Sequence, residues 1–228
     1  MQTNILILRF ENEISPYEVP YFRGAVIAAL ENKDTLFHNH MEDKLRYAYP
    51  LIQYKRIHQK AAIVCLGKGT EVIGNLFSAG MKEMVLGSRT ITPVLESVRP
   101  FRFNVQVWNN AFHYRITRWV ALNEKNYNSF ESLPSLTDKI TMLERILIGN
   151  ILSFAKGIGI HFDKQVECKI TSLSEQYSID YKAISFHAFN VGIVTNVSLP
   201  DFIGLGKHAS LNCGIVTKII AKNNSDNV

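Results

Sequence analysis

The sequence predicts an α+β fold built from two similar units in tandem, each with an antiparallel sheet. In both halves, short apolar or alternating runs typical of strands are interspersed with segments of helical periodicity. No low-complexity linker separates the halves. With 228 residues, 46% of them hydrophobic, the chain can build one large core or two small ones.

The first half has the order strand, helix, strand, strand, helix, strand. The apolar run NILILRF begins it, and PYFRGAVIAALENK places Phe22, Val26 and Leu30 at helical spacing. YAYPLIQYKRI and KAAIVCLG are expected as strands around a turn at 58–59. GTEVIGNLFSAG predicts a short helix, and EMVLGSRTITPVLESV alternates like a strand after Gly87. This βαββαβ order is that of the ferredoxin-like fold.

The second half repeats this order loosely. FRFNVQVW and FHYRITRWVAL are expected as strands on either side of Asn109 and Asn110. SLTDKITMLERILIGNILSFAKGIGI gives the strongest helix signal, with Ser135 or Thr137 as its N-cap. QVECKITSLS, SIDYKAISFHAFNVGIVTNVSL and ASLNCGIVTKII predict further strands. We therefore expect two ferredoxin-like units, at residues 1–98 and 99–228.

Several classes of protein are disfavoured by the composition. No segment approaches the roughly 18 consecutive apolar residues of a membrane span. The N-terminal apolar run is short and ends in charge, so we expect a strand there and not a signal peptide. Cys65, Cys168 and Cys213 lie far apart, which predicts buried free thiols, a cytoplasmic location and no structural zinc site.

Basic residues are concentrated in two stretches. The net charge is +5, and the stretch from Lys44 to Lys68 contains six basic residues and no acidic one. The stretch from Arg99 to Arg118 contains four arginines and again no acidic residue. This second stretch, together with the residue that follows it, also holds many aromatics: Phe101, Phe103, Trp108, Phe112, Tyr114 and Trp119. Cations interleaved with aromatic rings are typical of surfaces that bind single-stranded RNA, although the same aromatics could alternate into a sheet core.

Three histidines lie in the segment TLFHNHMEDKLRYAYPLIQYKRIHQK: His38, His40 and His58. Side chains two apart on an extended chain point the same way, so His38 and His40 could share a metal ion, but a third ligand at a telling spacing is missing. Alternatively, the pair could supply a general base and a general acid for RNA cleavage, in which the 2′-hydroxyl is the nucleophile. Loop histidines without a chemical role are the third interpretation.

The stretch FIGLGKHASLNCG carries Gly204, Gly206, Lys207 and Gly214 between two strand-like runs. Glycines allow the backbone to approach a phosphate, whose oxygens its N–H groups can bind. The stretch is neither a Walker A loop nor a dinucleotide-binding fingerprint. A simple tight turn is the alternative.

Together these features resemble a known family. A basic chain of this length with two ferredoxin-like units, a histidine after the first helix and a GLGKHASLNCG loop is similar to the CRISPR-associated endoribonucleases of the RAMP superfamily, which process precursor CRISPR RNA. The blocks LFHNHMEDKLRYAYPLIQYK and KAAIVCLGKG resemble the subtype I-B-like branch. The resemblance implies metal-independent cleavage within the repeat, without a cofactor. The products would be mature crRNA with a 2′,3′-cyclic phosphate or 3′-phosphate, and a 5′-hydroxyl.

The resemblance also implies roles for individual residues. We expect His40 as the base, His38 as its partner or the acid, and Tyr47 as an assisting group. The glycine loop would help to organise the RNA-binding cleft. The predicted RNA contacts are Lys44, Arg46, Tyr54, Lys55, Arg56, Gly204, Gly206 and Lys207, with Lys55 and Arg56 on opposite faces of a strand so that at most one reaches the RNA.

Two other functions stay open on the sequence alone. The chain could be a non-cleaving subunit that binds the repeat RNA in a CRISPR effector complex, or an unrelated metal-using enzyme on the same scaffold. Repeat RNA is the expected partner and a membrane is not. Other effector subunits, or a second copy of the chain in a homodimer, are further candidate partners.

Overall fold

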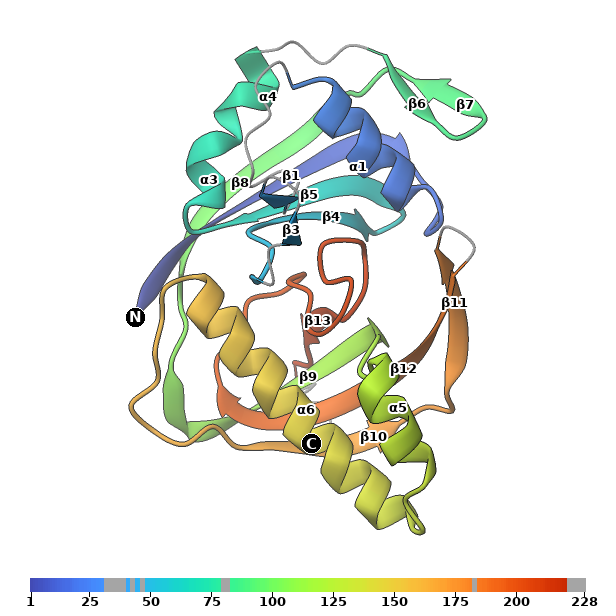
Figure 1. The fold of residues 1–228 in the computed structure, drawn as a ribbon. Coiled ribbons are helices and arrows are strands. Elements are labelled where there is room, and N and C mark those ends of the chain that lie inside the picture. The colour runs from blue at the N-terminus through green and yellow to red at the C-terminus, as the bar shows by residue number, and fades with distance from the viewer. Residues whose placement is uncertain (31–39, 42–43, 46–47, 79–82, 182–183, 221–228) are drawn as a thin grey trace, which may run out of the picture.

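The computed structural model describes residues 1–30, 40–41, 44–45, 48–78, 83–181 and 184–220. Two antiparallel sheets, one above the other in Figure 1, make up most of it. The first contains four strands in the order β4-β5-β1-β8, and the second contains five, in the order β10-β12-β9-β13 with β11 paired to β12. The predicted α+β fold with two ferredoxin-like units is confirmed.

In the first unit, the strands follow the expected sequence order and the helices lie on one face (Figure 1). Its elements are β1 (Gln2–Glu13), α1 (Val19–Ala28), β4 (Ile52–Ile57), β5 (Lys60–Leu66), α3 (Gly69–Val72), α4 (Gly74–Ser78) and β8 (Leu95–Asn104). Val19, Phe22 and Val26 are the buried positions of α1. A small hairpin, β6 (Met84–Leu86) and β7 (Arg89–Ile91), turns at Gly87.

The second unit uses the same strand order but only one helical connection. Its elements are β9 (Val107–Trp119), α5 (Glu124–Glu131), α6 (Leu136–Gly157), β10 (Cys168–Leu173), β11 (Tyr177–Tyr181), β12 (Ile184–Val197) and β13 (Ile215–Lys218). Between β12 and β13, where the fold would have its second helix, the chain forms a long loop without a helix. The glycine-rich stretch 204–214 is the last part of this loop.

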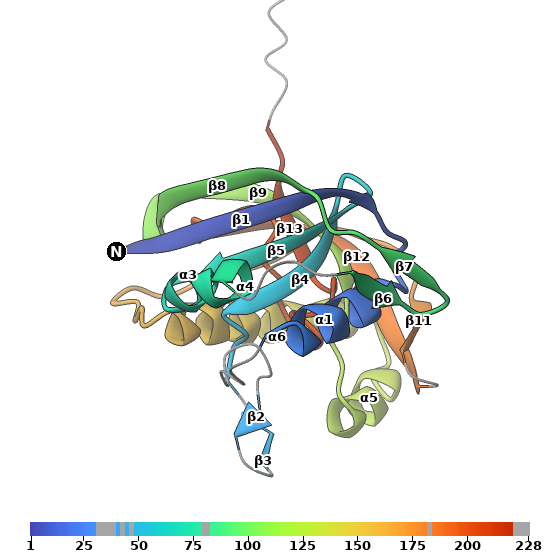
Figure 2. The ribbon, with the colours of Figure 1, turned by 90° about the horizontal axis from the view of Figure 1, so that it is seen from above.

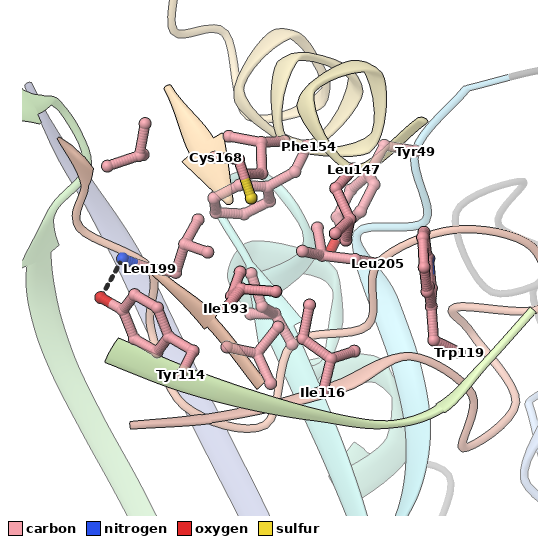
Figure 3. Packing of buried hydrophobic residues seen from close by; sticks show 14 of the residues in the cluster. Tyr49, Tyr114, Ile116, Trp119, Leu147, Phe154, Cys168, Ile193, Leu199 and Leu205 are labelled. Atoms are coloured by element: carbon pink, nitrogen blue, oxygen red, sulfur yellow. Dashed lines mark hydrogen bonds between the residues drawn. The ribbon is translucent and has the colours of Figure 1, made fainter. Parts of the chain in front are cut away.

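Helix α6 begins where its sequence predicts. The backbone N–H of Asp138 donates a hydrogen bond to Ser135 Oγ (3.1 Å), so Ser135 and not Thr137 is the N-cap. The apolar stripe of α6 buries Leu143, Leu147, Ile151 and Phe154. These side chains pack into a core that both sheets share, part of which is drawn in Figure 3.

This shared core joins the two units. It contains Ile5, Ile7 and Val64 from the first sheet together with Ile116 and Ile193 from the second. A separate cluster lies between α1 and the other face of the first sheet.

The boundary between the units lies later than the sequence suggests. β8 continues through Arg99 and Pro100 and pairs with β1 as far as Asn104. Pro100 is tolerated because β8 is an edge strand. The expected break at Asn109 and Asn110 is wrong, since β9 runs through both residues.

Candidate functional site

Residues 31–48 lie between α1 and β4 and carry His38 and His40. This part of the chain is called the histidine segment below, and only part of it is described. His38, Arg46 and Tyr47 lie outside the described residues. His40 and Lys44 are described through their backbones, in β2 (His40–Met41) and β3 (Lys44–Leu45). The two strands pair antiparallel, and Figure 2 shows their hairpin standing away from the two sheets. The catalytic roles of His38, His40 and Tyr47 stay predictions.

The chain that leaves this segment is fixed firmly at Tyr49. The Tyr49 hydroxyl donates a hydrogen bond to the Gly204 carbonyl (2.8 Å) and accepts one from Gln53 Nε2 (2.9 Å). The Gln53 Oε1 accepts a hydrogen bond from the backbone N–H of Gly204 (2.8 Å), which closes a buried network. The Tyr49 ring packs edge-on against Phe154, with 5.3 Å between ring centroids. The histidine segment is therefore anchored both to the glycine-rich loop and to α6.

Gly157 makes the contact between α6 and Tyr49 feasible. A Cβ added at Gly157 would lie 2.5 Å from the Cβ of Tyr49, closer than real side chains approach. Burial raises the pKa of Tyr49, so this hydroxyl stays protonated and acts as a hydrogen-bond donor. Tyr49 is thus a structural anchor and not a candidate acid or base.

The glycine-rich loop covers the free edge of β4. The Tyr54 N–H donates a hydrogen bond to the Ser210 carbonyl (2.8 Å), and the Asn212 N–H donates one to the Tyr54 carbonyl (3.1 Å). The Arg56 N–H donates to Asn212 Oδ1 (2.9 Å). The loop therefore satisfies backbone groups that an edge strand would otherwise leave to water or to another chain.

Lys55 points into the junction between β4 and this loop. Its side chain is completely buried, and its Nζ donates a hydrogen bond to the Ala209 carbonyl (2.6 Å). A Cβ at Gly204 would lie only 2.7 Å from this nitrogen, so the glycine leaves the space that Lys55 occupies. Burial lowers the pKa of Lys55 to about 7. A buried amine has no access to phosphate, so the expected RNA contact of Lys55 is wrong.

Tyr54 and Arg56 also have structural positions on β4. Tyr54 is completely buried and packs edge-on against Phe22 of α1, with 6.1 Å between ring centroids. Arg56 is half-buried, and its Nε donates a hydrogen bond to the Ile14 carbonyl (2.5 Å). The burial of Tyr54 contradicts its expected RNA contact. The Arg56 guanidinium is engaged by a hydrogen bond within the first unit. The two residues do alternate with Lys55 between the faces of the sheet, as predicted.

The remaining residues of the predicted RNA-binding set lie in the loop itself. Gly204 is buried, and Gly206 adopts a φ of +84° against Trp119, where a Cβ would come within 2.8 Å of the indole Nε1. Lys207 is exposed, and its N–H donates to the Val120 carbonyl (3.1 Å). Of the predicted cations whose side chains the structure describes, Lys207 is the exposed one, and its RNA contact stays a prediction.

The second basic stretch divides between core and surface. Tyr114 and Trp119 are buried in the shared core, as the alternation of a half-buried sheet allows. Arg99, Arg102 and Arg115 are exposed. Some aromatic surface accompanies them, since Phe101 and Trp108 are more than a third exposed (37% and 36%). The interpretation as a sheet core is therefore correct for Tyr114 and Trp119, whereas RNA binding by the exposed residues stays a prediction.

A cavity at the junction of the two units was not anticipated from the sequence. Its volume is about 470 Å³, and Tyr17, Tyr21, Arg118 and His208 are among its lining residues. Burial and the neighbouring charge of Lys207 lower the pKa of His208, which favours the neutral imidazole at neutral pH. The sequence signal for this cavity is the spacing of Tyr17 and Tyr21. The two tyrosines are four residues apart at the start of a helix, so their side chains lie on the same side of it.

Membrane-spanning helices and metal-binding clusters are the remaining features to consider among the described residues. Within the described part of the chain, no helix has the length and apolar character to span a membrane. No group of three or more histidine, cysteine or acidic side chains is arranged to hold a metal ion among these same residues. His38 and the side chain of His40 are outside the described residues, so the alternative of a metal site at these two histidines stays open. The three cysteines are free and buried, as predicted.

Comparisons with known proteins cover both units. The profile of the Cas6b N-terminal domain matches residues 1–100, and that of the Cas6b C-terminal domain matches residues 106–219. A crystal structure of Cas6b superposes with a TM-score of 0.85 at 24% identity, over 96% of this chain and 100% of that one. A crystal structure of the CRISPR RNA processing endoribonuclease Cas6b gives a TM-score of 0.74 at 22% identity, with the same coverage of both chains.

One sequence relative matches half of this chain. An uncharacterized protein of Methanocaldococcus jannaschii is 32% identical over 114 residues, which cover 50% of this chain and 76% of that protein. The two structures, being less than 25% identical, support the fold, whereas the two profiles together account for nearly the whole sequence. The chain belongs to the Cas6b family.

Proposed function

We propose that this protein is an endoribonuclease that cuts CRISPR repeat RNA at one site to give mature crRNA. The observation that carries the proposal is the match of both halves to the Cas6b family. A solved Cas6b that shares the fold is known as a CRISPR RNA processing endoribonuclease. The surface supports an RNA substrate, since Arg99, Arg102 and Lys207 are exposed cations on a chain of net charge +5.

The proposed chemistry uses the nucleophile that RNA itself carries. His40, as general base, removes the proton of the 2′-hydroxyl, and the 2′-oxygen attacks the adjacent phosphorus. The bond to the 5′-oxygen breaks, and His38 donates a proton to this leaving oxygen, assisted by Tyr47. The products are a 2′,3′-cyclic phosphate and a 5′-hydroxyl. Lys44 and Arg46 stabilise the negative charge that develops on the phosphate.

The residues on either side of the histidine segment are packed or hydrogen-bonded, and this favours the proposal. Leu30 is buried at the end of α1, and Tyr49 is hydrogen-bonded to Gly204 before β4 begins. The segment is thus held at both ends by the packed first unit and by the loop. Three free buried thiols are consistent with a reducing cytoplasm as the place of action.

One assay tests the proposal directly. Purified protein is incubated in EDTA with the CRISPR repeat RNA of its own genome, and with the same RNA carrying a 2′-deoxy substitution just before the cut. We expect one cut in the first RNA and none in the second. Cleavage that EDTA abolishes and zinc or manganese restores would contradict the metal-independent mechanism. Tight binding without cleavage would favour the alternative function, a non-cleaving repeat-binding subunit.

A further inference from the structure

The cavity of about 470 Å³ lies where the two units meet, at the end of α1 that is far from the histidine segment. The start of α1, the β11–β12 hairpin and the glycine-rich loop come together there, on the right of Figure 1. The helix has 10 residues, so the cavity and the segment are separated by roughly 15 Å of helix. An RNA strand needs only a few nucleotides to span the length of α1.

One wall of the cavity is aromatic and exposed. Tyr17 and Tyr21 line it and are 74% and 54% exposed, which is unusual for large rings that the core does not use. The turn that carries them is fixed, because Arg89 of the β6–β7 hairpin forms an ion pair with Glu18 (2.6 Å). Gly87 of the same hairpin lies against the Tyr21 ring. The turn and the Tyr21 ring are therefore positioned by the hairpin, and both tyrosines offer an exposed face on which a flat ligand can stack.

Other residues that line the cavity carry hydrogen-bonding groups. The Nε of Arg118 is buried and has no hydrogen-bond partner among the described residues, while the same side chain forms a hydrogen bond with Cys213, which also lines the cavity. The backbone of Arg118 is fixed at a φ of +55°, with its N–H donating to Asn190 Oδ1 (3.0 Å) and its carbonyl accepting from Gly214 (2.9 Å). His208 packs on Phe186 beside it, with 4.3 Å between ring centroids. A ligand edge that accepts hydrogen bonds would complete this part of the lining.

The charges around the cavity indicate which part of an RNA enters it. Arg118 and Asp180 both line the cavity, so their charges offset one another and a phosphate gains little by entering. Lys207, which is exposed and next to His208 in the chain, offers a cation outside. The volume lies within the range of about 300 to 1,000 Å³ that is usual for small-molecule pockets, which suits one planar ring system better than an extended peptide.

We infer that this cavity binds one unpaired nucleobase of the RNA substrate, an inference that rests on the proposed function. The base stacks on Tyr17 or Tyr21, and Arg118 donates a hydrogen bond to its edge. The phosphate beside this base remains outside, near Lys207. Stacking on tyrosine with a hydrogen bond to the base edge is a common way to bind unpaired RNA.

The test combines protein variants with a scan of the RNA. Repeat RNAs that each lack one base, with the backbone intact, are titrated against wild type, Tyr17→Ala, Tyr21→Ala and the double variant. We expect one position at which removal of the base weakens wild-type binding by about tenfold but weakens the double variant no further. Tyr21→Phe keeps the ring and should bind like wild type.

Phe77→Ala is the matched control. Phe77 is 41% exposed on α4, outside the cavity lining, so its removal should leave the effect of every missing base unchanged. Because the tyrosine side chains are exposed, their removal should leave the melting temperature within a few degrees of wild type.

The outcomes separate this inference from the proposed function. If wild type cuts the repeat but the losses from tyrosine variants and missing bases simply add at every position, the pocket is wrong and the proposed function stands. If the losses are coupled at one position but no variant, wild type included, cuts the RNA, the pocket stands and the proposed nuclease is wrong. Tyrosine variants that bind every RNA like wild type would overturn the pocket and would point to a protein ligand for these rings.

Discussion

Lys55 places an amine in the interior of the protein, where the Ala209 carbonyl accepts its hydrogen bond. Burial lowers its pKa from 10.5 to about 7. Between these two values the unfolded chain carries a proton on Lys55 that the folded protein has released. The free energy of unfolding should therefore rise with pH in this interval. Above roughly pH 8 the effect is opposed, because burial raises the pKa of all three cysteines, Cys65, Cys168 and Cys213, and the unfolded chain then releases their protons first.

The resulting prediction concerns stability between pH 7 and about 8. The free energy of unfolding, measured by urea denaturation, should rise in wild type by roughly 1 kcal/mol per pH unit, the linkage of one proton. Lys55→Met removes the titrating group and should flatten the curve. Lys68→Met, at an exposed lysine, is the control and should keep the wild-type slope. Equal slopes in all three proteins would contradict a neutral buried Lys55.

A second prediction at this scale concerns the histidines. His38→Ala and His40→Ala should each lower the single-turnover cleavage rate by about 100-fold or more, as expected for a positioned acid or base. Binding should change little, since a neutral imidazole adds little attraction for phosphate. His58→Asn is the matched control, because His58 is exposed in the β4–β5 turn at a φ of +50°, which asparagine tolerates. Near-normal rates for both alanine variants would place the active site elsewhere.

Among the secondary-structure elements, the junction of β4 and the glycine-rich loop depends on close packing. A Cβ at Gly204 would lie 2.5 Å from the Ala209 carbonyl oxygen, so Gly204→Ala must displace the loop from the strand. We expect a loss of about 1 to 3 kcal/mol in the free energy of unfolding, as is usual for overpacking.

Gly149→Ala is the comparison for this prediction. Gly149 is exposed within α6 and has no atom within 4 Å of an added Cβ. Alanine there should stabilise the protein by up to about 1 kcal/mol through its helix propensity. Urea denaturation of both variants measures the difference, and a Gly204→Ala protein as stable as wild type would show that the loop is not tightly packed on β4.

The elements also show how far the sequence can predict. The period of 3.6 residues located α6, and Ser135 capped it as its type suggests, because these signals are local. Lys55 alternates with its neighbours as expected, but alternation does not say what covers each face. Its cover comes from Ala209, a residue 154 positions away. The Asn109–Asn110 pair suggested a break between two strands, yet β9 pairs with β12 on both sides of it, at Val107 and at Phe112, with a register shift between them.

At the scale of the whole molecule, the shared core makes one folding unit out of two sheets. Ile7 and Val64 of the first sheet belong to the same cluster as Ile116 and Ile193 of the second. A cluster of this kind couples the stability of both sheets, because neither can open without exposing apolar surface of the other.

We therefore predict a single unfolding transition. Both tryptophans lie in β9, so their fluorescence reports on the second unit, whereas far-ultraviolet circular dichroism reports on both. Val64→Ala, a completely buried change in the first sheet, should lower the free energy of unfolding by about 2 kcal/mol. It should shift the midpoints of both signals equally. A shift confined to circular dichroism would mean that the units unfold independently.

The loop that seals β4 has a consequence for the order in which the chain is made. The ribosome releases the first sheet early, but the carbonyl that accepts from Lys55 is synthesised 154 residues later. At about 5 to 20 residues per second this interval lasts roughly 8 to 30 s. During that time the edge of β4 is open and can pair with a neighbouring nascent chain. The first sheet is thus completed only when the glycine-rich loop of the second half has left the ribosome. A chaperone that covers the edge of β4 would therefore be most useful late in translation.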